Sequence, residues 1–97
     1  MKEKRYITNP LVIKRKIAGQ IILIPQKKLL KIPKENSIYI LNKVSGLIWD
    51  LLSQKKTIIQ IITVLVQRFK DVDRKEIESD ILEILREWKK KKLISAK

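Results

Sequence analysis

The sequence predicts an α+β fold in which a small antiparallel sheet precedes three helices. Short runs of Ile, Leu and Val, separated by Gly and Pro, fill residues 11–41. Apolar residues then recur every three or four positions as far as about residue 91. The first pattern is typical of strands and the second of amphipathic helices. A length of 97 residues suits a single domain over 1–97, with an N-terminal tail over residues 1–9.

The expected sheet has three strands. The turn signal Ala18-Gly19 separates the first two, which therefore form a hairpin. Ile and Tyr favour extended, pleated backbone in the last strand, which follows a turn at residues 33–36. The strand segments are residues 11–17, 20–24 and 37–41, and residues 29–32 either extend the second strand or add a short one.

Three helices are expected, over about residues 43–53, 57–69 and 73–91. Asn42 ends the strand pattern and is a good N-cap, because its side chain can accept a backbone N–H of the first turn. Thr57 and Asp73 are expected to cap the other two helices, with Glu76 as the capping-box partner of Asp73. Gly46 costs about 1 kcal/mol relative to Ala inside a helix, which indicates a close neighbour.

The residue types exclude several classes of function. The chain has no Cys for a disulfide and no His, the commonest general base and metal ligand. The apolar runs are too short to span a bilayer and no signal peptide is recognisable, so a cytoplasmic protein without membrane contact is expected. The seven acids in residues 71–87 are interspersed with Lys and Arg, which is typical of a solvated helix face. We therefore expect no enzyme, no catalytic residue, no cofactor and no metal site.

The net charge of +13 favours an acidic partner. Residues 1–36 carry a net charge of +8, and residues 71–97 only +1. Nucleic acid, an anionic membrane and an acidic peptide all have the required chemistry. The alternative is a lysine-rich surface that serves only to solvate the protein.

The arrangement of three helices beside a small sheet resembles a winged helix-turn-helix, which makes nucleic-acid binding an alternative function. The reading helix would be the third, and its first turns contain Asp73, Glu76 and Asp80. Acids at this position repel the phosphate backbone. The basic residues 14–16 and 27–34 could still contact phosphate without sequence preference. Nucleic acid is therefore the second choice.

The strand over residues 37–41 could accept a peptide if it lies at the edge of the sheet. It is apolar on both faces, with Ile40 on one and Tyr39 and Leu41 on the other. An edge strand has unpaired N–H and C=O groups with which an extended peptide can pair. Leu82 lies off the apolar stripe of the third helix and could form the floor of a groove beside that strand. The alternatives are an internal strand, or an edge that pairs with a second copy to give a homodimer.

The order and spacing of these motifs resemble the PqqD family, the RiPP recognition elements. These domains occur as separate proteins or as parts of larger ones, and they are encoded in gene clusters that make ribosomal peptide natural products. The resemblance covers about residues 20–94, and its later part is a Thr-capped helix followed by a helix with an acidic start. The matching positions are Leu41, Asn42, Gly46, Ile48, Trp49, Leu51, Leu52, Thr57, Phe69, Leu93 and Ile94.

The resemblance implies a winged-helix-like fold of three strands packed on three helices. It implies that the leader peptide of a precursor binds as an extra antiparallel strand along the last strand, in the cleft against the third helix. The implied partners are this leader, expected to be acidic, and a separate modifying enzyme such as a radical SAM enzyme, a cyclase or a leader peptidase. Transferred to this sequence, the candidate peptide-binding residues are Ser37, Ile38, Tyr39, Ile40, Leu41, Lys75, Glu78, Ser79, Leu82 and Arg86.

Overall fold

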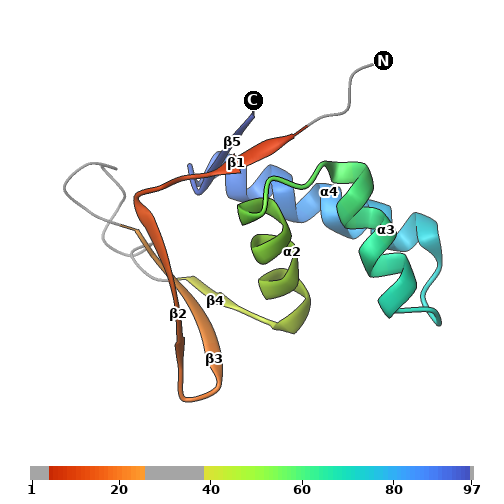
Figure 1. Cartoon of the computed structure of the whole chain (residues 1–97), viewed down its shortest axis with the longest axis horizontal. Helices are drawn as coiled ribbons and strands as arrows, with labels where there is room; N and C mark the ends of the chain where they lie inside the picture. The colour runs from red at the N-terminus through yellow and green to blue at the C-terminus, as the bar shows by residue number, and fades with distance from the viewer. Residues whose placement is uncertain (1–4, 26–38, 97) are drawn as a thin grey trace.

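The computed structural model describes residues 5–25 and 39–96, and these form two small sheets and three helices (Figure 1). The α+β fold class is confirmed, with an antiparallel sheet of order β2-β3-β4 preceding the helices. Each helix begins and ends within one residue of the expected bounds. The elements are β1 (Tyr6–Thr8), β2 (Val12–Ile17), β3 (Gln20–Pro25), β4 (Tyr39–Leu41), α2 (Lys43–Ser53), α3 (Ile58–Arg68), α4 (Arg74–Lys90) and β5 (Ile94–Ala96).

The three-stranded sheet is built on the β2-β3 hairpin. Ala18 and Gly19 have φ angles of 51° and 80°, the two positive values that a two-residue type I′ turn requires. Strand β3 pairs with β2 on one side and with β4 on the other, where Leu23 lies opposite Tyr39. The expected extension of the second strand and the turn after it, residues 29–36, lie outside the described residues.

The helix starts agree with the sequence at two of three caps. The Asn42 side chain accepts the N–H of Ser45 at 2.7 Å, as expected for the N-cap of α2. Thr57 caps α3 through a full capping box, in which its hydroxyl and the Gln60 side chain each bind the other residue's backbone N–H. Asp73 precedes α4 but makes no side-chain cap hydrogen bond, so the predicted capping box there is wrong.

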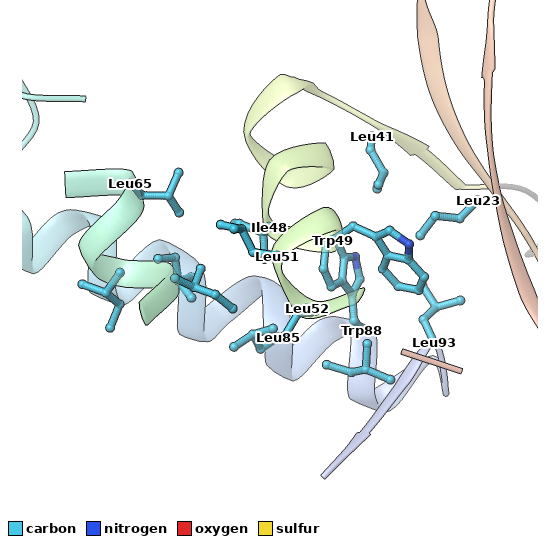
Figure 2. Packing of buried hydrophobic residues seen from close by; sticks show 14 of the residues in the cluster. Leu23, Leu41, Ile48, Trp49, Leu51, Leu52, Leu65, Leu85, Trp88 and Leu93 are labelled. Carbon is cyan, nitrogen blue, oxygen red and sulfur yellow. The ribbon is translucent and has the colours of Figure 1, made fainter. Parts of the chain in front are cut away.

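The core lies where α2, α3, α4 and the inner face of the β2-β3-β4 sheet meet (Figure 2). Trp49 of α2 and Trp88 of α4 pack edge to face, with ring centroids 5.4 Å apart and planes at 79°. The sheet contributes Leu23, which is fully buried, and Leu41. Trp49 lies off the main apolar stripe of its helix because it fills the space beside α4 rather than beside α3.

The two ends of the described chain pair with each other. Strand β1 is antiparallel to β5, with Tyr6 opposite Ala96. Asn9 strengthens the join, because its backbone N–H donates to the Leu93 carbonyl at 2.9 Å and its amide donates to the Lys92 carbonyl at 3.0 Å. The N-terminal tail predicted over residues 1–9 is therefore corrected, since residues 6–9 belong to the folded body.

Candidate functional site

Strand β4 lies at the edge of the three-stranded sheet. Within the described residues its only strand partner is β3, so its other side has no ladder. Its side chains alternate as a half-buried strand should: Leu41 is buried, Tyr39 is half-buried and Ile40 is 65% exposed. The N–H and C=O groups on that side are the kind of edge to which an extended peptide can add.

The junction of β4 with α2 holds this edge in place. Asn42 accepts the N–H of Ser45 with its side chain and the N–H of Gly46 with its carbonyl, so the strand turns directly into the helix. Gly46 is buried against Ile21 of β3, and a Cβ at this position would collide with Ile21 Cδ1. The predicted close neighbour of Gly46 is therefore a sheet residue. The lack of a side chain allows α2 to approach the sheet closely.

Helix α4 lies alongside β4 and the start of α2. At one end, Lys91 Nζ lies 5.1 Å from the centroid of the Tyr39 ring, within range of a cation–π contact. At the other end is a shallow hollow of about 350 Å³, with Asn42 and the start of α2 on one side and α4 on the other. The lining residues are Asn42, Val44, Ser45, Asp80, Glu83 and Ile84.

An apolar pocket of about 140 Å³ adjoins the hollow, with which it shares Val44, Asp80 and Ile84. The pocket lies between α2, the end of α3 and α4. Three large apolar side chains at its rim remain more than a third exposed: Val44 at 37%, Phe69 at 36% and Val72 at 37%. A hollow that continues into an apolar pocket can hold one apolar side chain of a bound peptide, since small pockets of this kind select ligands by shape.

The described strand residues of the predicted site lie in β4, whereas its helix residues lie on the flank of α4 away from the hollow. Tyr39, Ile40 and Leu41 form β4, while Ser37 and Ile38 lie outside the described residues. Leu82 is 45% exposed, as its position off the stripe predicts, but the hollow is lined by Ile84. Residues two apart on a helix point about 200° from each other at roughly 100° per residue. The other helix candidates on the flank away from the hollow are Lys75, Glu78, Ser79 and Arg86.

The flank of α4 that faces the hollow, and Val44 and Phe69 at the pocket, are not among the residues predicted from the sequence. The apolar stripe of α4 defines which residues are buried, but the sheet can lie on either side of that stripe. Val44 and Phe69 follow the helical period of their own helices and were therefore indistinguishable from core residues. The signal that could have found them is their place at helix ends, where apolar side chains are covered from fewer directions.

The described residues offer little that points to catalysis or to nucleic acid. They contain no group of three or more His, Cys, Asp or Glu that could hold a metal ion. In the first turns of α4, Asp73, Glu76 and Asp80 are exposed, and Arg74 is bound to Glu78 at 2.9 Å. This end of the helix would repel a phosphate backbone. None of the helices in the described part of the chain is long and apolar enough to cross a membrane.

Both the sequence and the fold resemble known proteins. The family model described as "Coenzyme PQQ synthesis protein D (PqqD)" matches residues 20–94. The fold is similar to a solved structure described as "TbiB1 in Complex with the TbiA(beta) Leader Peptide", with a TM-score of 0.74 and 23% sequence identity. That likeness covers 91% of this chain and 93% of the other. No curated protein matches the sequence.

Proposed function

This chain belongs to the PqqD family, and we propose that it binds the leader segment of a ribosomally made precursor peptide as an added strand along β4. The bound leader is held for a separate modifying enzyme, and the chain itself does no chemistry. The observation that carries the proposal is that one side of β4 has no strand partner among the described residues and that β4 ends next to a hollow and an apolar pocket. Backbone hydrogen bonds to β4 would supply affinity, and the pocket would select a side chain.

The helix side of the site is proposed to be the flank of α4 that lines the hollow. Val44 and Ile84 would contact the leader's apolar side chains, and Asp80 and Glu83 would border them. The sequence-based alternative is the opposite flank, with Leu82 at its centre. Val44 and Leu82 are both apolar and are 37% and 45% exposed, so they form a matched pair for distinguishing the two flanks.

The charges of α4 beside β4 refine the expectation of an acidic leader. The net charge of +13 would speed the approach of an acidic peptide. At the Asn42 end of β4, α4 nevertheless bears Asp80 and Glu83, whereas at the Tyr39 end it is followed by Lys91. An antiparallel leader would begin at the Asn42 end and finish at the Tyr39 end. Its carboxylates are therefore proposed to follow the strand-forming segment rather than to precede it.

The partner enzyme is proposed to be a radical SAM enzyme, a cyclase or a leader peptidase. A second copy pairing with β4 is the remaining alternative, because an open edge also accepts an identical strand. Nucleic-acid binding has no specific support, since the exposed start of α4 is acidic.

Hydrogen exchange tests strand addition directly. The probe is the leader segment of the short peptide encoded beside this chain in its source genome. At saturation, the β4 amides that point away from β3 are expected to exchange at least tenfold more slowly, while those of Tyr6–Thr8 in β1 stay unchanged. A leader that binds without slowing β4 exchange would rule out strand addition. Slow β4 exchange without leader, in a dimer seen by sedimentation, would support self-pairing.

A pair of substitutions tests the helix flank. Val44→Gln is expected to weaken leader binding about tenfold, because it puts a polar group at the entrance of the apolar pocket. Leu82→Gln is expected to leave the dissociation constant within twofold. Isothermal titration with each purified variant measures both, and thermal melts check that both remain folded. The reverse result would assign the site to the Leu82 flank.

A further inference from the structure

The β2-β3-β4 sheet has an outer face, directed away from α2, that consists mainly of isoleucine. Side chains alternate between the faces of a sheet, and Leu23 and Leu41 mark the inner face because they are buried in the core. The register then assigns the intervening residues to the opposite side. This outer sheet face comprises Ile13, Arg15 and Ile17 of β2, Gln20, Ile22 and Ile24 of β3, and Ile40 of β4.

The outer sheet face is exposed at two of its borders. Ile17, at the hairpin end of β2, is 52% exposed, and Ile40, on β4, is 65% exposed. Arg15 of β2 lies opposite Ile22, which lies opposite Ile40, so one row crosses all three strands. Single exposed apolar residues are ordinary, but a contiguous apolar patch on a soluble domain typically marks an interaction surface.

The charge of this face indicates what it fits. The only ionisable side chain in the set is Arg15, and β2, β3 and β4 contain no Asp or Glu. Lys14 and Lys16 point to the inner side, where Lys14 forms an ion pair with Asp50 of α2. The outer sheet face is therefore largely apolar, with one cation on its edge strand β2. A complementary surface would be apolar and would carry a carboxylate opposite Arg15.

A second copy of this chain is a poor occupant of the same face. Face-to-face pairing about a two-fold axis places identical patches together. Each copy would then press Arg15 against an apolar face to which β2, β3 and β4 contribute no carboxylate. Burying a cation without a partner is costly, so the same face of a second copy is not complementary.

We infer that the outer sheet face docks the modifying enzyme, through an apolar surface on that enzyme bearing an Asp or Glu for Arg15. This inference rests on the proposed function, because the enzyme is the protein that must meet the bound leader. A leader strand added to β4 would continue the sheet beyond Ile40 and would enlarge the same face. Docking therefore strengthens when the leader is bound.

The test measures binding of the enzymes encoded beside this chain, each purified, to the full chain saturated with leader. Ile17→Gln is expected to weaken the enzyme complex about tenfold. Ile59→Gln is the matched control, because Ile59 is 53% exposed on α3 and receives the same substitution. Arg15→Glu is expected to weaken the complex at least tenfold, and Lys16→Glu, the adjacent residue on the inner side, by less than threefold.

The outcomes separate this inference from the proposed function. Leader affinity is measured for every variant and is expected to stay within twofold. Enzyme binding that survives both Ile17→Gln and Arg15→Glu would overturn docking on this face, even with the leader bound. A loss of leader affinity in the same variants would instead assign the face to leader binding and would also overturn it. A failure of the unmodified chain to bind leader would contradict the proposed function first.

Discussion

Strands β1 and β4 are both three residues long and each has one strand partner among the described residues, but β1 joins the two ends of the chain whereas β4 leads from the sheet into a helix. Strand β1 pairs with β5 from the C-terminal end, and the preceding Arg5 forms a bridge with Thr57. Strand β4 pairs with β3 and, among the described residues, with nothing else. The C-terminal strand is thus committed to β1 and does not cover β4. An edge strand normally carries charge or a bulge that discourages pairing, whereas β4 is Tyr-Ile-Leu.

The largest expected effect comes from weakening the closed strand pair. Ile94 of β5 is 3% exposed, and Ile94→Ala is expected to lower the free energy of unfolding by about 2–5 kcal/mol through lost burial and the cavity that remains. Chemical denaturation measures this change. The exposed neighbour Ser95→Ala is the control, with an effect within about 0.5 kcal/mol. Leader affinity that falls together with stability would show that the two strands are not independent.

The next effect concerns the attachment of β1 to the helices. Thr57 is 1% exposed and caps α3, so Thr57→Ala is expected to cost about 1–2 kcal/mol of unfolding free energy. Thr63→Ala is the matched control on the same helix, because the Thr63 hydroxyl only bonds the Ile59 carbonyl at an exposed position. Equal effects of the two substitutions would mean that the cap does not anchor this side of the molecule.

A coupling experiment examines the β4 side. A methyl group at position 46 meets Ile21 Cδ1, which Ile21→Val removes. Gly46→Ala is therefore expected to be more favourable in the Ile21→Val background than in the unmodified chain, by about 1 kcal/mol. Thermal or denaturant unfolding of the four proteins gives the coupling free energy. A value of zero would mean that Ile21 can rotate away freely and does not fix the start of α2.

The smallest expected effect is at the ion pair between β2 and α2. The side chains of Lys14 and Asp50 are 35% and 43% exposed, so Lys14→Ala is expected to cost only about 0.2–1 kcal/mol. The difference should shrink further in 1 M salt, where the screening length is about 3 Å. A larger, salt-independent loss would mean that Lys14 supports the sheet by packing rather than by charge.

Local signals in the sequence predicted the helices and two of their caps. The 3.6-residue period set the bounds of α2, α3 and α4, and Asn42 and Thr57 are residues whose side chains complete a first turn. Asp73 is a residue type that favours the N-cap, but its side chain makes no cap hydrogen bond, because the residue type does not fix the rotamer. The β2-β3 hairpin was likewise predictable from Ala18-Gly19, since its pairing is local.

Features that depend on distant parts of the chain were not predictable. The pairing of Tyr6–Thr8 with Ile94–Ala96 joins two short segments in which apolar and polar residues hardly alternate. Neither segment therefore indicates from its own sequence that it pairs with the other. The same limit applies to α4, where the sequence gives the buried stripe but not the side on which β4 lies. Tyr39 was therefore assigned correctly to β4, while the helix residues chosen with it lie on the flank away from the hollow.

The β1–β5 join has a practical consequence for tethering. Tyr6 and Ala96 face each other, so anything fused to either end starts from the same place on the molecule. Helix α2 runs from the end of β4 towards β1, and its eleven residues span about 16 Å at 1.5 Å per residue (Figure 1). A leader tethered at either end would thus start about one helix length from β4.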